Sequence, residues 1–191
     1  MGMDPDVVSS YGYTVFSGDR VATGTAPTVP DDMDYALIRV RITNPVTEIS
    51  GDPLEPPPQS TIFGGAMRGE LDLLAFSDMA QSQSWEVIPA VEDIRHVMSE
   101  VGEENTVLSI YFRQPFVLDE KSGFMDAGGI VALFGVSDEA LMDVVTGGFN
   151  PVGQLPFALA NSGEAILRQA SDAPGYSDED TLFPFGFGLS Y

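Results

Sequence analysis

The chain contains no cysteine, one histidine, His96, and one lysine, Lys121, among its 191 residues. The lack of cysteine excludes disulfide bonds, thiol chemistry and zinc–thiolate sites. One histidine without any cysteine leaves too few side chains for a transition-metal site or a serine-type catalytic triad. We therefore expect no metal and no cofactor. His96 falls off the apolar stripe of its predicted helix, and we interpret it as an exposed surface residue.

The chain also has no apolar run of membrane-spanning length and no signal-peptide pattern at its N-terminus. The opening Met1-Gly2-Met3 is typical of a start added for expression, so cytoplasmic, periplasmic and extracellular locations all stay open. Acidic residues outnumber basic ones, 29 against 8, and the net charge of −21 repels nucleic acid and anionic membranes. We expect neither as a partner. Adaptation to salt and ordinary solubility explain this acidic surface equally well.

What the chain does contain is typical of one globular domain over residues 1–191. Apolar residues make up 43% of the sequence, enough for a substantial core at this length. Apolar segments alternate with amphipathic ones, which is the pattern of a layered α/β domain. The sequence therefore predicts an α/β fold, a three-layer sandwich in which a mostly parallel sheet is flanked by helices.

The clearest strand pattern lies at Tyr35–Ile42, where apolar side chains alternate with positions that include Arg39 and Arg41. Buried strands are predicted at Thr106–Phe112 and Gly129–Phe134. Because a crossover helix is expected between these two, they should run parallel. The other predicted elements are helices at Asp4–Tyr11, Val91–Val101, Asp119–Ala127 and Ser162–Gln169, a helix capped by Ser137 with Ala140, Leu141, Val144 and Val145 as its buried face, and strands at Tyr13–Phe16 and Leu155–Leu159.

A long irregular segment, from about 43 to 83, follows the first convincing strand and is broken by Pro56-Pro57-Pro58 and Gly64-Gly65. Loops of this length are usually functional or disordered, and ligands of α/β sheets bind outside the carboxyl ends of strands, where this loop begins. Its carboxylates can accept hydrogen bonds from sugar hydroxyls or donate a proton to a leaving oxygen. In so acidic a chain, a solvated loop charge is the simpler interpretation of any one of them. They are Asp52, Glu55, Glu70 and Asp72.

Two other features have structural interpretations. Trp85, the lone tryptophan, can stack on a sugar face, but we favour a place at the edge of the core. The turn Gly135-Val136-Ser137-Asp138 precedes a predicted helix, where phosphates often bind. It lacks the repeated glycines and the lysine of nucleotide loops, so no anion site is predicted there.

The tail of the chain carries two segments that are dense in glycine, proline and phenylalanine. Phe149–Phe157 reads Phe-Asn-Pro-Val-Gly-Gln-Leu-Pro-Phe, and Leu182–Tyr191 reads Leu-Phe-Pro-Phe-Gly-Phe-Gly-Leu-Ser-Tyr. Together they resemble the end of the C-terminal α/β domain of glycoside hydrolase family 3, the β-glucosidase-like enzymes. The match is strong from Gly135 onward and moderate at Tyr35–Ile42. Arg68–Leu73 resembles a family segment that reads Asp-Arg, two residues, then Leu-x-Leu-Pro.

This resemblance implies one domain of a retaining glycosidase. In that family a barrel domain supplies the aspartate nucleophile and most sugar contacts, while the α/β domain often lends the acid/base carboxylate. Because nothing in this chain looks like the barrel, we expect it to be inactive alone, with the absent barrel domain as its partner and a carbohydrate as the substrate. Glu55 and Glu70 are the candidate acid/base residues. Arg68 is the candidate orienting cation, with Asp52 and Asp72 as further substrate-binding residues.

The chain departs from the family pattern at four positions, which weakens the local active-site match more than the match in fold. Met67 replaces an aspartate, Leu74 replaces a proline, Gly64 lies near the place of a glutamate, and Gln154 replaces a basic residue. The missing aspartate before Arg68 and the glycines at 64–65 favour an alternative function, that of a non-catalytic carbohydrate-binding or assembly module. A stand-alone flavodoxin-like or receiver-like protein is disfavoured, since its phosphate loop or acidic pocket should be visible in the sequence and neither is.

The resemblance also predicts which surface meets the barrel. A domain that packs beside a barrel should carry an apolar patch on that side. The stretch Phe183–Phe187 and the loop around residues 60–69 are the candidates for this face.

Overall fold

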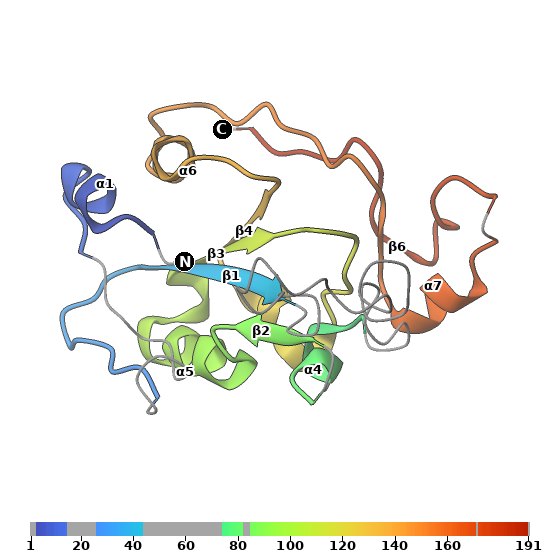
Figure 1. The fold of residues 1–191 in the computed structure, drawn as a ribbon, viewed down its shortest axis with the longest axis horizontal. Coiled ribbons are helices and arrows are strands. Elements are labelled where there is room, and N and C mark those ends of the chain that lie inside the picture. Colours follow the sequence, from blue (N-terminus) through green and yellow to red (C-terminus); the bar gives the residue numbers. More distant parts are fainter. Residues whose placement is uncertain (1–2, 15–25, 44–73, 82–84, 171, 191) are drawn as a thin grey trace, which may run out of the picture.

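The computed structural model describes residues 3–14, 26–43, 74–81, 85–170 and 172–190. Its centre is a four-stranded sheet in the order β2-β1-β3-β4, with helices on both faces, and a two-stranded sheet, β5-β6, follows (Figure 1). The strands are β1 (Ala36–Thr43), β2 (Glu86–Ile88), β3 (Thr106–Tyr111), β4 (Gly129–Leu133), β5 (Leu159–Ala160) and β6 (Thr181–Phe183). The α-helices are α1 (Pro5–Ser10), α4 (Phe76–Met79), α5 (Val91–Val101), α6 (Asp138–Val145) and α7 (Gly163–Arg168), and the 3₁₀ turns are η2 (Glu103–Asn105), η3 (Glu120–Ser122) and η4 (Phe124–Asp126).

The main sheet is mostly parallel, as predicted. β1 pairs with β3 and β3 pairs with β4 in parallel, whereas the short edge strand β2 runs antiparallel to β1. The predicted strands at Tyr35–Ile42, Thr106–Phe112 and Gly129–Phe134 are confirmed to within one residue at each end. The carboxyl ends of the three parallel strands therefore meet at one edge of the sheet.

The main core lies on the face of the sheet that α5 covers. Apolar side chains of β1 and β3 alternate toward this face, and full burial of each contributes roughly 1.5–3 kcal/mol. The most deeply buried members include Val40, Ile42, Phe76, Ile94, Leu108, Ile110, Phe116 and Phe124. The helix predicted at Val91–Val101 is confirmed, and it ends at Gly102, whose φ of 101° lies in the region that favours glycine.

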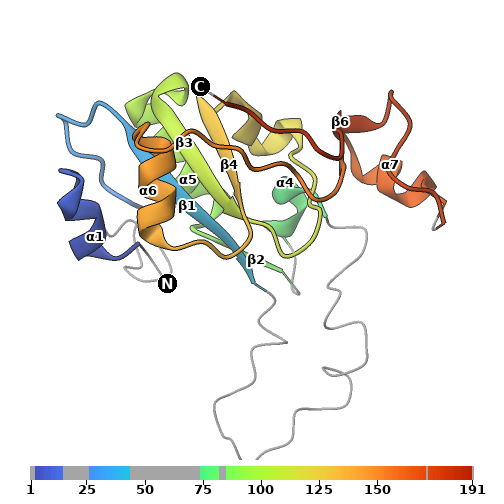
Figure 2. The same cartoon turned by 90° about the horizontal axis from the view of Figure 1, so that it is seen from above.

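The opposite face is covered by α6, and α1 lies alongside α6 (Figure 2). The sequence predicted Ala140, Leu141, Val144 and Val145 as the buried face of α6. This is partly wrong, because Met142 is buried and Ala140 is exposed. Asp138, Leu141 and Met142 share one helical stripe, and the ion pair of Asp138 with Arg39 of β1 turns that stripe toward the sheet.

Polar contacts hold α1 against α6, and α1 itself confirms the helix predicted at Asp4–Tyr11. The backbone N–H of Asp4 donates to Asp138 Oδ2 at 2.7 Å, and the Tyr11 hydroxyl donates to Asp143 Oδ1 at 2.6 Å. This hydrogen bond is the main cause of a raised pKa of Tyr11, to which desolvation and nearby carboxylates add. Two aspartates of α6 therefore anchor both ends of α1.

The crossover between β3 and β4 consists of two 3₁₀ turns, so the helix predicted at Asp119–Ala127 is wrong in type. Gly123 lies between η3 and η4 with φ of 71°, a left-handed conformation that interrupts an α-helix. Asp119 accepts the backbone N–H of Ser122 at 3.1 Å and that of Ser77 at 3.0 Å. The crossover is thus tied to α4.

Two short elements were missed by the sequence analysis. α4 falls inside the segment expected to be irregular, and β2 directly follows Trp85. They have four and three residues, too few for a periodic pattern to identify them.

Two predicted strands are wrong in extent. Tyr13 and Thr14 lie outside any strand, and the rest of that predicted strand is outside the described residues. The strand predicted at Leu155–Leu159 pairs only at its end, in β5. Pro156 offers no backbone donor, which limits regular pairing earlier in this segment. The helix predicted at Ser162–Gln169 is confirmed as α7, with Ser162 as its N-cap.

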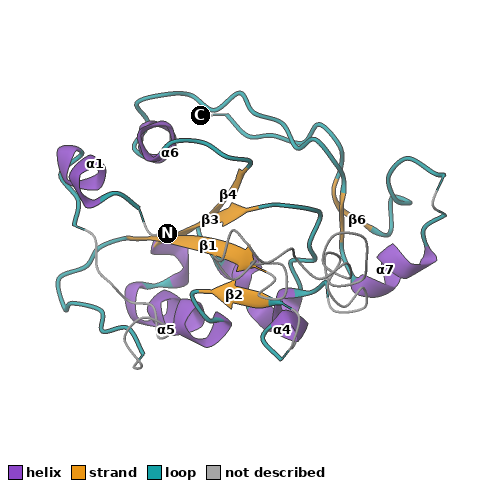
Figure 3. Cartoon of the chain, viewed as in Figure 1, coloured by secondary structure: helices purple, strands orange, loops and turns teal. Residues whose placement is uncertain are grey.

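The two glycine-, proline- and phenylalanine-rich segments of the tail lie against each other as long loops (Figure 3). The Leu155 N–H donates to the Phe187 carbonyl at 2.8 Å, and the Gly186 N–H donates to the Leu155 carbonyl at 3.0 Å. A Cβ at position 188 would lie 2.4 Å from the Gly153 carbonyl oxygen. Gly188 therefore permits the close approach of the two backbone segments.

Gly128, just before β4, is a second position without room for a side chain, since a Cβ there would lie 2.1 Å from the Glu104 carbonyl oxygen. We expect Gly128→Ala to lower the free energy of unfolding by about 2–3 kcal/mol, because backbone must move to accept the methyl group. In Gly163→Ala the added Cβ meets nothing within 4 Å. This control should change stability by less than about 0.5 kcal/mol in urea denaturation. Equal effects of the two substitutions would contradict the account.

The raised pKa of Tyr11 predicts how alkaline pH acts on the fold. Since the neutral phenol is favoured in the folded chain, its contribution is fully present below the ordinary tyrosine pKa of 10.0 and is lost as pH rises through the higher folded pKa. Burial also raises the pKa of Tyr176, which therefore acts in the same alkaline range. Tyr11→Phe should reduce the alkaline loss of unfolding free energy, and adding Tyr176→Phe should reduce it further. An alkaline profile that neither substitution changes would contradict this assignment.

Candidate functional site

The carboxyl ends of β1, β3 and β4 form the edge at which an α/β sheet binds ligands. The chain leaves β1 at Thr43 and enters residues 44–73, which contain every site residue predicted from the sequence. Those residues, Asp52, Glu55, Arg68, Glu70 and Asp72, lie outside the described part of the structure. Their roles therefore stay predictions. The edge from which this segment departs is described.

A carboxylate that the sequence analysis did not select stands at this edge. Glu86 is the first residue of β2 and lies opposite Thr43, the last residue of β1. The Thr43 hydroxyl donates to Glu86 Oε2 at 3.3 Å, and Thr43 is buried while Glu86 is half-buried. The available signal was an alternation in which buried Trp85 and Val87 flank Glu86. This run was too short to be assigned as a strand.

An arginine and a tyrosine share the sheet face of Thr43. Side chains two residues apart on a strand point to the same face, so Arg41 and Thr43 lie on one side of β1. Tyr111 is the register partner of Arg41 across the β1–β3 pair. Arg41 is half-buried, whereas Tyr111 is 38% exposed and is the one exposed residue of β3. The edge thus combines a carboxylate, a guanidinium group and an aromatic ring.

Aromatic side chains form the apolar support of this edge. Trp85 meets Phe116 edge-on, with 5.7 Å between ring centroids, and Phe112 lies 6.1 Å from Phe116. Phe134, which follows β4, meets Phe157 at 5.7 Å. Trp85 is only 5% exposed, so the interpretation of this residue as part of the core edge is confirmed. A buried indole ring offers no face on which a sugar can stack.

The turn before α6 provides acceptors and negative charge. The Ser137 hydroxyl accepts the backbone N–H of Ala140 at 3.3 Å, as expected for an N-cap. Asp138 lies in the first helical turn, where the helix dipole favours a carboxylate, and pairs with Arg39. The Ala140 N–H is therefore already used, and the Asp138 carboxylate adds negative charge where an anion would have to bind.

A polar hollow of about 470 Å³ lies between α5 and the η3–η4 crossover. His96 lines this hollow and is half-buried. The expectation of an exposed histidine is therefore wrong in degree. The reason is that the crossover packs against that side of α5. Arg95 and Lys121 also line the hollow, together with the carboxylates of Glu92, Glu103, Glu120 and Asp126. Across the described residues, no group of three or more His, Asp or Glu side chains is arranged to hold a metal ion.

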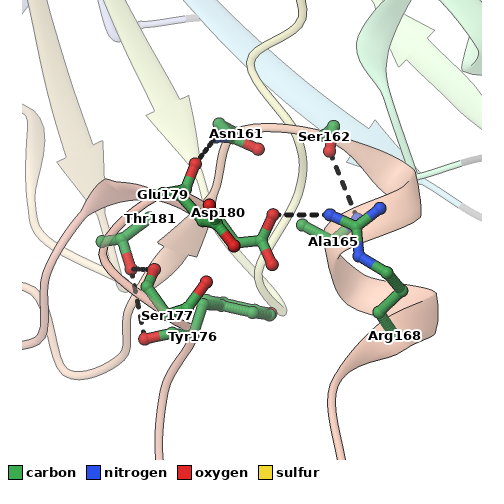
Figure 4. A network of polar contacts seen from close by, with 9 residues as sticks. All are labelled: Asn161, Ser162, Ala165, Arg168, Tyr176, Ser177, Glu179, Asp180 and Thr181. Carbon is green, nitrogen blue, oxygen red and sulfur yellow. Dashed lines mark hydrogen bonds and ion pairs between the residues drawn. The ribbon is translucent and has the colours of Figure 1, made fainter.

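A second hollow, of about 360 Å³, lies between α7 and the loop that leads to β6, beside the polar network drawn in Figure 4. Arg168 pairs with Asp180 at 2.6 Å, and Asn161 and Thr181 donate to backbone carbonyls of the same loop at 2.6 and 2.8 Å. The Tyr176 side chain lines the hollow. Because these three donors close the loop on itself, we interpret this network as structural. No helix of the described residues has the length and apolar character needed to cross a membrane.

Comparisons with known proteins agree with the resemblance that the sequence motifs indicated. No family model matches the chain. The probable β-glucosidase C of Aspergillus flavus is 28% identical over 193 residues, and β-glucosidase C of Emericella nidulans is 27% identical over 190 residues, each alignment covering 100% of this chain. The periplasmic β-glucosidase/β-xylosidase of Dickeya chrysanthemi is 29% identical over 162 residues and covers 85% of the chain.

The chain spans about a quarter of the length of the fungal relatives, 24% in both cases. The chain is similar to one part of these β-glucosidases. The resemblance to the C-terminal α/β domain of glycoside hydrolase family 3 enzymes is thereby confirmed as a resemblance that extends over the whole chain. A solved β-glucosidase from Chaetomium thermophilum matches 55% of this chain and 15% of its own, with 23% identity and a TM-score of 0.41.

The tail motifs that carried the resemblance have structural roles. The rings of Phe183 and Phe187 pack against each other with 4.7 Å between centroids, and Phe183 also contacts the main core. Gly188 allows the two tail segments to approach closely. Phe185 and Leu189, in contrast, are 75% and 71% exposed.

Proposed function

We propose that this chain is the C-terminal domain of a β-glucosidase-like retaining glycoside hydrolase and that it completes a sugar site beside a barrel domain. The observation that supports this most strongly is the asymmetry of the alignments. They cover 100% of this chain but only 24% of the fungal β-glucosidases. Such an asymmetry is expected of one domain of a larger enzyme, and the α/β fold fits a domain of this size.

The chemistry divides between the two domains in this proposal. A retaining glycosidase needs two carboxyl groups about 5 Å apart on either side of the scissile bond. The barrel would supply the nucleophile, and Glu55 or Glu70 of this chain would supply the acid/base carboxylate. Arg68 would orient the sugar, with Asp52 and Asp72 as further contacts. In favour of this division, residues 44–73 follow the carboxyl end of β1, where sheet ligands bind.

The surface that would meet the barrel lies on the tail. Exposed apolar side chains here include Phe149, Val152, Phe185 and Leu189, with exposed fractions of 55%, 77%, 75% and 71%. The predicted stretch Phe183–Phe187 offers less exposed apolar surface than expected, because the rings of Phe183 and Phe187 pack against each other. The other predicted part of this face, residues 60–69, lies outside the described residues.

A non-catalytic carbohydrate-binding or assembly module is the alternative, favoured by the departures at Met67 and Gly64. Titration of the chain alone with oligosaccharides separates the two functions. A dissociation constant in the micromolar range would favour the module. Half of an active site should show no binding at such concentrations.

The first test of the proposal compares the chain alone with the chain joined to its barrel domain, using an aryl β-glucoside. The joined polypeptide should turn over at about 1 s⁻¹ or faster, as ordinary glycosidases do, while the chain alone should show no turnover. Hydrolysis by the chain alone at a rate comparable with ordinary glycosidases would overturn the proposal.

The second test removes the candidate acid/base carboxylates in the joined polypeptide. Glu55→Ala or Glu70→Ala, whichever removes the acid/base group, should lower kcat by roughly 10²–10⁴-fold, and added azide should restore activity. Glu103→Ala, which removes a carboxylate from η2 at the other end of the sheet, is the matched control and should leave kcat unchanged. If both test variants keep their rate and affinity, neither residue is the acid/base.

A further inference from the structure

The described part of the carboxyl edge contains sugar-compatible side chains that the sequence analysis did not assign to a site. We propose that Arg41, Glu86 and Tyr111, called the edge triad below, contact a β-glycoside at this edge and determine how its sugar ring is held. This inference rests on the proposed function, because it takes the substrate class from it. Its basis is the placement of three side chains on one face of the sheet.

Strand register brings the edge triad together. Arg41 of β1 is paired with Tyr111 of β3 on one side and with Ile88 of β2 on the other. Two residues further along β1, Thr43 is paired with Glu86. Neighbouring strands lie about 4.8 Å apart, so the three side chains emerge from adjacent positions of one face. They come from three strands of a rigid sheet, which makes their relative placement independent of residues 44–73.

The chemistry of the edge triad matches a pyranose ring. Glu86 can accept hydrogen bonds from sugar hydroxyls, and the Thr43 hydroxyl at 3.3 Å orients its carboxylate. Arg41 offers a fixed fork of donors to hydroxyl or ring oxygens. Tyr111 presents an aromatic ring for the apolar C–H face of the sugar and a hydroxyl that donates or accepts. A polyhydroxylated ring needs this combination of donors, acceptors and apolar surface.

Arg39 provides an internal comparison on the same strand and the same face. Its charge is matched by Asp138 of α6, which covers the sheet at that position. Arg41 lies two residues nearer to the carboxyl end of β1. The described residues contain no ion-pair partner for it within 4.0 Å, since their other ion pair joins Arg168 to Asp180. In a chain with 29 acidic and 8 basic residues, a cation that has no such partner within the described part of the structure is available to a ligand at this edge.

A nuclear magnetic resonance titration of the chain with methyl β-D-glucopyranoside tests this assignment. We expect saturable, millimolar binding, since the edge triad is only part of a site, with amide shifts concentrated at Thr43, Glu86 and Tyr111. Tyr111→Ala should weaken binding roughly threefold to tenfold through loss of the ring, while Tyr111→Phe should retain most of it. Glu86→Gln should also weaken binding, because a neutral amide replaces a charged acceptor.

Tyr35→Ala is the matched control, because Tyr35 is 73% exposed and immediately precedes the opposite end of β1. It should leave the dissociation constant unchanged. A well-dispersed amide spectrum verifies that each variant is folded. No shifts at millimolar glucoside, shifts confined to other surfaces, or equal losses in Tyr35→Ala and Tyr111→Ala would overturn the assignment.

The outcome is separable from that of the proposed function. If the joined polypeptide hydrolyses glucosides but the edge triad variants bind normally, this inference fails and the proposed function holds. If the edge triad binds glucoside but the joined polypeptide shows no hydrolysis, the inference holds for a binding module and the proposed enzyme function fails.

Discussion

The parallel pairing of β1 with β3 is the constraint on which the rest of the structure depends. On one face, Val40 and Ile42 pack with Ile110 beneath α5, and on the other, Arg39 meets Asp138 of α6. A slip of one residue along β1 would exchange these faces and bury arginine side chains in the apolar core. The pairing therefore fixes which side chains reach the carboxyl edge.

This constraint also relates the described part of the edge to the part proposed from the sequence. Residues 44–73 begin where β1 ends at Thr43, and Glu86 of β2 lies directly opposite that residue. Both the predicted acid/base candidates and the edge triad therefore depend on the position of one strand end. A sheet with helices packed on both faces provides the rigid support that such a site needs.

Much of the fold was predictable from the sequence because its main elements are long and strongly patterned. Val91–Val101 carries its apolar stripe and a terminating Gly102, and the prediction matches α5 at both ends. The β3–β4 crossover was predicted as a helix because a glycine's left-handed conformation at Gly123 does not show in an apolar pattern. The buried face of α6 was partly wrong because tertiary contacts of Asp138 with Arg39 set the rotation of the helix.

The candidate site was less predictable than the fold. Glu86 lies on a strand of three residues, which is too short to show a periodic pattern. Tyr111 becomes a candidate only when the strand register places it beside Arg41. Sequencing of the reading frame upstream of Met3 is the most direct test of the central claim, that this domain is one half of a sugar-cleaving enzyme. We predict that sequencing finds a barrel-encoding segment in frame ahead of it. A gene that begins at this chain, with no barrel ahead of it, would contradict the claim.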